Sequence, residues 1–200
     1  MRRLFTGLFL GVVMLTSQAF AAAEVGKPAP AFTATDSNGK THSLSDFAGK
    51  TVVLEWTNHD CPFVKKFYKA GKMQELQRAA TADGVVWLSV ISSAPGKEGH
   101  VTGAAANKLT TDRNAAPAAV LLDEKGTVGK LYGAKTTPHF FIVNSAGVVA
   151  YAGAIDSIKS TDSADIASAT NYVAQALGEL KAGKAVSIPS TQAYGCSVKY

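Results

Sequence analysis

The stretch that decides the fold is Thr51-Val52-Val53-Leu54-Glu55-Trp56, followed by Thr57-Asn58-His59-Asp60 and then by Cys61-Pro62-Phe63-Val64. A run that is mostly apolar on both faces is typical of a strand inside a sheet. Pro62 suits the first position of a helix, where its missing N–H costs nothing. Cys61 therefore lies at the start of a helix, where the helix dipole and the unpaired amides favour a thiolate. The stretch predicts a redox-active cysteine between a central strand and a helix.

The N-terminus has the three parts of a secretory signal peptide. Arg2 and Arg3 form the basic part, and residues 4–15 are an apolar run that is too short to span a membrane. Small residues then allow cleavage after Ala21 or Ala23. We expect a periplasmic or otherwise exported protein that uses the general secretory route, with the twin-arginine route as the alternative.

We divide the chain into a signal peptide at 1–23, one domain at 24–181 and a C-terminal tail at 182–200. The chain has 20 basic and 15 acidic side chains. Without Arg2 and Arg3 the balance is 18 to 15, a net charge of +3, which is too small and too scattered to suggest nucleic-acid binding. No later segment is apolar enough to cross a bilayer, so we expect no membrane contact after signal cleavage.

Turn residues and apolar runs divide the domain into alternating strands and helices. Asn38-Gly39 marks a tight hairpin turn, and Gly71 is expected to bend or interrupt the helix that starts at Cys61. Apolar strands that alternate with helices favour parallel pairing, and a final hairpin adds antiparallel strands. The fold class is therefore α/β, with a central mixed β-sheet flanked by helices on both faces and an N-terminal hairpin extension. The expected elements, in chain order, are a hairpin at 32–44, a helical turn at 44–50, a strand at 51–56, a helix from 61 to about 80, a strand at 85–91, a short helix at 102–109, a strand at 118–122, a short helical segment at 123–132, a hairpin at 140–152 and a last helix from Ser163 or Asp165 to about 180.

The chain has two cysteines, Cys61 and Cys196, which lie 135 positions apart (196 − 61). An exported protein can keep a disulfide, and two cysteines allow one intramolecular pair. The four histidines show no metal-ligand spacing, and one cysteine in the loop is too few for a copper-delivery site. The sequence also has no Gly-rich phosphate loop and no nucleophile elbow. We therefore expect no metal and no cofactor.

Four segments resemble the peroxiredoxin-like branch of the thioredoxin superfamily, the alkyl hydroperoxide reductase and thiol-specific antioxidant family. The segments are Val25-Gly26-Lys27-Pro28-Ala29-Pro30-Ala31-Phe32, Leu44-Ser45-Asp46-Phe47-Ala48-Gly49-Lys50, Cys61-Pro62 and Thr137-Pro138-His139-Phe140-Phe141-Ile142-Val143. They occur in the family's order, and the resemblance covers about residues 25–180. It implies a thioredoxin-like fold, antioxidant activity and a thiol reductant of the thioredoxin type. It also implies that Pro138 is a cis-proline packed against Cys61 and that Thr137 binds substrate through its backbone.

The sequence departs from that family at three positions near the cysteine. Val64 stands where the dithiol members have a second cysteine, so the first cysteine has no neighbouring resolver. Asn58 stands where peroxiredoxins have the threonine that orients the peroxide, and we assign Asn58 to substrate binding. Thr137 stands at about the position of an arginine near the sulfur, and Arg113 and Lys65 are the candidates to replace its charge.

Charged neighbours of Cys61 are candidates for tuning its reactivity. A protonated His59 favours a thiolate, whereas an inward Asp60 carboxylate opposes one, and we expect Asp60 to point to solvent. Lys66 lies one turn into the helix and is expected to be solvated. His139 is expected to be packed or hydrogen-bonded within its strand.

Three functions fit these residues. In the leading hypothesis, Cys61 attacks a hydroperoxide and becomes a sulfenic acid, and Cys196 resolves it as a disulfide that a thiol reductant reopens. In the second, the chain exchanges disulfides with protein partners, and Thr137-Pro138 holds an extended peptide strand. In the third, it is a redox-inert binding module with a structural Cys61–Cys196 disulfide. The distance between the two sulfur atoms in the folded chain is the discriminating observation.

Overall fold

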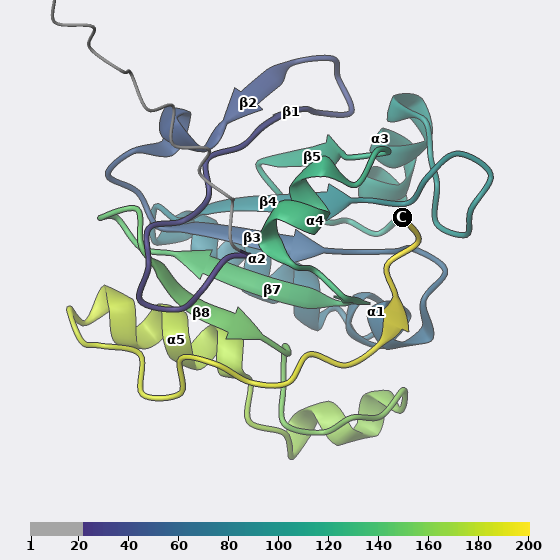
Figure 1. Cartoon of the computed structure of the whole chain (residues 1–200). Helices are drawn as coiled ribbons and strands as arrows, with labels where there is room; N and C mark the ends of the chain where they lie inside the picture. The colour runs from purple at the N-terminus through teal and green to yellow at the C-terminus, as the bar shows by residue number, and fades with distance from the viewer. Residues whose placement is uncertain (1–21) are drawn as a thin grey trace, which may run out of the picture.

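The computed structural model describes residues 22–200, so nearly all of the predicted signal peptide lies outside the described residues. The core is a five-stranded sheet of order β5-β4-β3-β7-β8, which Figure 1 shows between layers of helices. Its strands are β3 (Val52–Trp56), β4 (Val86–Ile91), β5 (Ala119–Leu122), β7 (His139–Val143) and β8 (Val149–Gly153). The other elements are β1 (Thr33–Thr35), β2 (Thr41–Ser43), β6 (Thr136–Thr137), β9 (Cys196–Ser197), α1 (Pro62–Lys69), α2 (Lys72–Ala82), α3 (Gly103–Asp112), α4 (Thr127–Tyr132), α5 (Tyr172–Lys181) and the 3-10 turns η1 (Leu44–Phe47) and η2 (Ser163–Ala167). Over residues 22–200, no helix has the length and apolar character needed to cross a membrane.

Strand β3 lies in the middle of the sheet, as its apolar sequence predicts. It pairs parallel with β4, which in turn pairs parallel with β5. On its other side it pairs antiparallel with β7, so that Leu54 faces Leu88 on one neighbour and Phe141 on the other. The hairpin of β7 and β8 closes the sheet. The predicted combination of parallel early strands and an antiparallel hairpin is confirmed.

Helices and loops cover both faces of the sheet because the strand residues alternate between two cores. One core joins Val53, Trp87 and Phe140 to the apolar sides of α1, α2 and α5. The other joins Leu54, Trp56 and their neighbours to α4 and the N-terminal segment. The first of these cores holds α1 against the carboxyl end of β3, which is where Cys61 lies.

The helical predictions are correct for α1 to α4 and for the end of the last helix, and wrong for the start of the last helix. Gly71 separates α1 from α2 with a positive φ of 74°, as expected. The helix predicted from Ser163 or Asp165 is instead the 3-10 turn η2 followed by α5. Helix α5 starts later because Asn171 caps it, accepting a hydrogen bond from the Ala174 amide at 2.9 Å.

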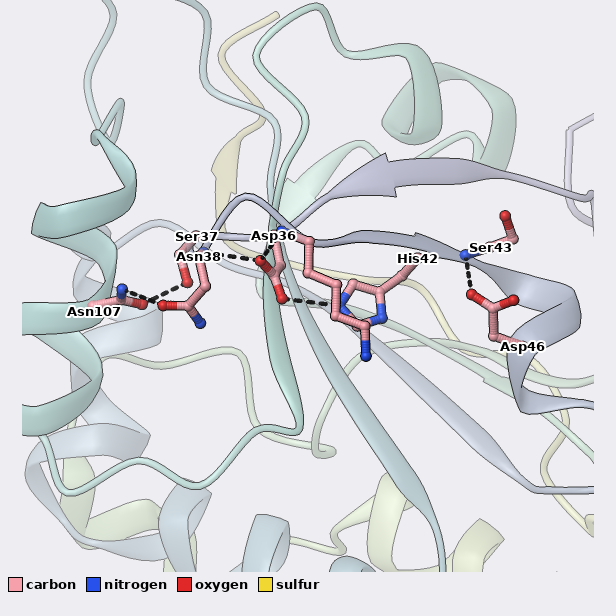
Figure 2. A network of polar contacts seen from close by, with 8 residues as sticks. Asp36, Ser37, Asn38, His42, Ser43, Asp46 and Asn107 are labelled. Atoms are coloured by element: carbon pink, nitrogen blue, oxygen red, sulfur yellow. Dashed lines mark hydrogen bonds and ion pairs between the residues drawn. The ribbon is translucent and has the colours of Figure 1, made fainter.

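The N-terminal hairpin of β1 and β2 is held by the buried side chain of Asp36 (Figure 2). One carboxylate oxygen accepts hydrogen bonds from the Asn38 and Lys40 amides at 2.8 and 2.9 Å. The other lies 2.8 Å from Nε2 of His42. Asn107 on α3 donates to the Asn38 side chain at 2.8 Å and so ties the turn to the domain. Burial opposes ionisation of Asp36, but these hydrogen bonds outweigh it and lower its pKa.

The C-terminal tail runs from the end of α5 across the molecule to β9 beside α1, in yellow in Figure 1. It passes β8, where the Thr191 amide donates to the Ala152 carbonyl at 3.1 Å. It then pairs through β9 with β6, directly before β7. The tail therefore carries Cys196 to the carboxyl end of β3 although it begins at the other end of the domain.

Candidate functional site

Cys61 is the N-cap of α1, and its side chain is fully buried. The amides of Val64 and Lys65 donate to its carbonyl oxygen at 3.0 and 2.9 Å and so start the helix. Its Sγ lies 3.1 Å from the carbonyl oxygen of Thr137. The bond between Thr137 and Pro138 is cis, as the resemblance implied. The structure thus brings three predicted site residues together across 76 positions of sequence.

Cys196 reaches the same place from the tail. The pairing of β9 with β6 sets Cys196 opposite Thr137. Both cysteines are free thiols, and their Sγ atoms lie 2.6 Å apart. Because a disulfide bond is about 2.05 Å long, a small movement brings the pair to bonding distance. Cys196 is half-buried and Cys61 is fully buried, so Cys196 is the sulfur of the pair that solvent reaches.

Gly195 allows the tail to come this close to the cis-proline loop. Its φ is +141°, a conformation that residues with a side chain rarely adopt. A Cβ atom at this position would lie 2.0 Å from the Thr137 carbonyl oxygen and 2.7 Å from the carbonyl carbon. Only glycine fits between Thr137 and the tail, so the residue directly before Cys196 is fixed by the geometry of the site.

The two sulfur atoms lie in different electrostatic environments. Burial, the hydrogen bond with Cys61 and the charge of Cys61 together raise the pKa of Cys196 to about 12. Cys196 is therefore protonated at pH 7. Cys61 instead caps α1, whose free N–H groups and dipole stabilise negative charge.

Tyrosine hydroxyls anchor the tail on both sides of Cys196. The Tyr194 hydroxyl donates to Asp156, and its ring packs edge-on against Phe63 with the centroids 5.7 Å apart. Further back, the Tyr151 hydroxyl lies 2.6 Å from Oγ1 of Thr191. After the cysteine, the Tyr200 hydroxyl donates to a backbone carbonyl at 2.7 Å. These anchors involve neither sulfur, so they hold the tail in place with both cysteines reduced.

Asn58 and Arg113 brace the loop before Cys61 and do not reach its sulfur. The Asn58 amide group donates to Glu98 at 3.2 Å, and its oxygen accepts from the Asp60 amide at 2.8 Å. Arg113 donates to the backbone carbonyl of His59 at 3.0 Å. Among residues 22–200, no hydrogen bond or ion pair joins either side chain to the Cys61 sulfur. Both side chains therefore fix the loop backbone.

The side chains of His59 and Lys65 both lie against the carboxylate of Asp60. Burial lowers the pKa of His59. The negative charge of Asp60 raises this pKa, and the positive charges of Arg113 and Lys65 lower it. A neutral imidazole at pH 7 does not supply the positive charge that the sequence suggested for it. Lys65 lies 3.5 Å from Asp60, and both side chains are exposed. Within the described part of the chain, no group of three His, Cys, Asp or Glu side chains could hold a metal.

Lys66, which the sequence places in solvent, is buried, so that prediction is wrong. Its side chain is fully inaccessible, with Nζ 3.6 Å from Oδ2 of Asp156, itself 2% exposed. The prediction fails because Asp156 lies 90 positions away in a loop after β8 (156 − 66), and nothing in the local sequence points to it. Lys66, Asp156 and Tyr194 are site residues that sequence reasoning missed. An apolar helix face interrupted by one lysine was the only available signal.

Beneath the site, the buried Glu55 of β3 organises the core. Its carboxylate accepts hydrogen bonds from Tyr68, Gln77, Trp87 and Ser89 at 2.8 to 3.2 Å. Burial raises its pKa, and the four hydrogen bonds work against that rise. Fully bonded to the core, Glu55 fixes β3 and α1 relative to each other.

A five-stranded mixed sheet, a cysteine at the start of α1 and a cis-proline before β7 define a protein of thioredoxin-like fold. The chain belongs to the Redoxin family, whose family model matches residues 24–173. The predicted thioredoxin-like α/β fold is thereby confirmed. None of the curated protein sequences matches the chain significantly.

Solved structures share the same fold. A hypothetical protein from Sinorhizobium meliloti 1021 is 21% identical with a TM-score of 0.75, over 90% of this chain and 96% of that one. An uncharacterized conserved protein from Geobacillus kaustophilus is 24% identical with a TM-score of 0.75, over 88% and 92%. A putative thioredoxin from Neisseria meningitidis is 21% identical with a TM-score of 0.52, over 63% and 78%. At these identities the likeness concerns the fold alone.

Proposed function

We propose that the chain is a thiol–disulfide oxidoreductase whose redox centre is the pair Cys61 and Cys196. The observation that carries this proposal is the 2.6 Å distance between two free thiols on segments 135 positions apart. The pair replaces the two neighbouring cysteines of a Cys-x-x-Cys motif, whose second position is Val64 in this chain. Cys196 supplies the second thiol of the pair from the tail.

The proposed cycle alternates between this dithiol and a Cys61–Cys196 disulfide. A thiolate of a dithiol partner attacks Cys196, the half-buried sulfur, and the disulfide bond breaks with its electron pair on Cys61. Cys61 is the better leaving group because the N-terminus of α1 stabilises its charge. The partner's second thiol then displaces Cys196, which leaves as a protonated thiol, and the partner becomes oxidised. In the reverse sequence Cys196 gives up its proton as it attacks a substrate disulfide, and Cys61 then displaces the substrate from Cys196, which leaves the substrate reduced.

The backbone at Thr137 is the proposed binding place for an extended partner segment. In this structure the chain's own β9 pairs with it. Pairing of a partner strand requires β9 to move aside, since both use the same edge of β6. Partner binding and tail position are therefore coupled in this proposal.

Reduction of a hydroperoxide is the second candidate. Cys61 thiolate would attack the peroxide, giving a sulfenic acid and an alcohol or water, and the Cys196 thiol would condense with it to give the disulfide and water. The proximity of Cys196 favours this resolution step. The attack itself has less support, because Asn58 and Arg113 are bonded to the loop instead of to the sulfur. We therefore rank disulfide exchange first.

The test compares two oxidants on the purified chain from residue 24 to 200. Glutathione disulfide is expected to convert both thiols to a Cys61–Cys196 disulfide, detected by peptide mass mapping, and a thioredoxin-type reductant should reopen it. Cys61→Ser and Cys196→Ser serve as controls that cannot form the bond. If peroxide oxidises Cys61 hundreds of times faster than it oxidises free cysteine, hydroperoxide reduction becomes the first-ranked function. If no dithiol reductant opens the disulfide, the remaining hypothesis is a structural Cys61–Cys196 disulfide in a redox-inert chain.

We also propose that the chain is exported and that its signal peptide is removed. The support is the order of basic, apolar and small residues in segment 1–23. An oxidising compartment allows a Cys61–Cys196 disulfide to persist. N-terminal sequencing of the protein from a periplasmic fraction should begin at residue 22 or 24, and a chain that retains Met1 would contradict export by cleavage.

A further inference from the structure

Three buried polar side chains connect the tail to the helix that carries Cys61. Lys66 on α1 has its Nζ 3.6 Å from Oδ2 of Asp156. The other Asp156 oxygen accepts hydrogen bonds from the Tyr194 hydroxyl and, at 3.1 Å, from the Ile158 amide. We name Lys66, Asp156 and Tyr194 the Asp156 cluster. Its three members come from a helix, a loop and the tail, and the cluster is the place where these segments meet.

Burying the charged groups of the Asp156 cluster has a high free-energy cost. The Lys66 side chain is fully buried and Asp156 is 2% exposed. Lys66 Nζ and Asp156 Oδ2 each have no hydrogen-bond partner within residues 22–200. Removing two charges from water can cost more than such a pair regains, and apolar residues of the same size often stabilise a core better. A buried ion pair is a strong constraint on geometry, however, because displacing one member leaves the other charge unpaired.

The Asp156 cluster lies close to Cys196 along the chain. Only Gly195 separates Tyr194 from Cys196. The Tyr194 ring also packs against Phe63, which is two residues after Cys61 on α1. Burial and the hydrogen bond to Asp156 raise the pKa of Tyr194, so its hydroxyl remains a donor. Tyr194 is therefore fixed to the same helix whose N-cap is the other cysteine.

We propose that the Asp156 cluster positions Cys196 against Cys61, with Tyr194 as the direct hold on the tail and Lys66 and Asp156 as its support. The inference rests on the proposed function, since it concerns the approach of the two sulfur atoms. These three are positioning residues because none of them touches a sulfur. Gly195 packs closely against the Thr137 backbone, so a shift of Tyr194 also moves Cys196.

The test measures the effective concentration of the Cys196 thiol at Cys61. In glutathione buffers, the two protein thiols and one glutathione disulfide are converted to the protein disulfide and two glutathione thiols. The equilibrium constant of this reaction is the effective concentration, and measuring it requires no natural substrate. Tyr194→Phe removes one hydroxyl and keeps the ring, and we expect it to lower the constant tenfold or more. The buried Cys61 thiol should also react faster with an alkylating reagent, because the tail covers it less.

The matched control is Tyr200→Phe, which removes another tail hydroxyl with a hydrogen bond of its own, to the carbonyl of Ala134. We expect it to change the constant less than twofold, since it lies beyond the β9 pairing. Equal constants for the wild-type chain and Tyr194→Phe, or equal losses in both tyrosine variants, would overturn the inference. Circular dichroism of the reduced proteins checks that the fold is retained.

A second variant keeps the inference testable if Tyr194→Phe does not fold. Asp156→Asn retains an acceptor for the Tyr194 hydroxyl and removes the charge that faces Lys66. We expect a threefold or larger fall in the constant, and an unchanged constant would contradict the supporting role of the ion pair. A wild-type chain that forms no Cys61–Cys196 disulfide would overturn the proposed function itself. If the wild-type chain forms the disulfide and the variants have the same equilibrium constant as the wild-type chain, only the positioning role is overturned.

Discussion

Replacement of Gly195 by alanine is expected to separate Cys196 from Cys61 without changing either cysteine. The added Cβ would meet the Thr137 carbonyl oxygen at 2.0 Å, whereas ordinary contact begins at 3.4 Å, so the tail must retreat by about 1.4 Å (3.4 − 2.0). A displacement of this size breaks the pairing of β9 with β6. Lost ladder hydrogen bonds cost about 1 kcal/mol each, and a side chain at this φ adds roughly 1–3 kcal/mol of strain.

Together these terms disfavour the docked tail by about 3 kcal/mol, which corresponds to roughly a hundredfold fall in the glutathione equilibrium constant for the Cys61–Cys196 disulfide. Gly183→Ala is the matched control. Gly183 also has a positive φ, of +69°, but nothing lies within 4 Å of its Cβ position. The control should alter the constant by less than about threefold. A Gly195→Ala chain that forms the disulfide as readily as the wild-type chain would refute the close-approach argument.

The remaining predictions concern pH and the direction of attack. Burial lowers the pKa of His139 from 6.5 to about 4, so between these two pH values the unfolded chain binds a proton that the folded chain does not. The free energy of unfolding should therefore rise by up to about 3 kcal/mol as the pH rises from 4 to 6.5. Urea titrations of His139→Asn should lack that rise. The pKa of Asp36 is lowered, so its contribution is full above the unfolded value and disappears as the pH falls through the folded one, and Asp36→Asn should be less stable than the wild-type chain at pH 7 but not at pH 2. In the oxidised chain, a partner lacking its second thiol should be trapped on Cys196, and peptide mapping that finds it on Cys61 would contradict the proposed cycle.

The local part of the site could be predicted from sequence, and the part that crosses the chain could not. The strand before Cys61 and the proline after it are adjacent in sequence, so their periodicity and backbone preferences suffice to place the thiol at a helix start. The cis-proline loop was placed by resemblance. The sequence predicts the pairing of Cys196 with Cys61 only because the chain has two cysteines. Nothing in that count predicts β9, because a two-residue strand has no periodicity.

The errors have the same physical origin. The sequence gives no reason to bury Lys66, since its carboxylate partner is supplied by a distant loop. Asn58 and Arg113 have the right chemistry for the sulfur, but loop packing uses their hydrogen bonds elsewhere. The sequence does not define the start of α5, because Ser163, Asp165 and Asn171 are all suitable caps. Tertiary contacts decide among such equivalent local choices.

The source of the positioning energy distinguishes this pair from a neighbouring dithiol. In a Cys-x-x-Cys motif, one turn of helix holds the two sulfur atoms together, and the helix start governs the potential. Here the tail anchors at Thr191 and Tyr194 hold Cys196, and they do so in the reduced chain. Every anchor that raises the effective concentration of Cys196 also makes the disulfide harder to reduce. In the proposed cycle, the packing of the tail therefore sets the redox potential, and a partner that lifts β9 from β6 changes that potential as it binds.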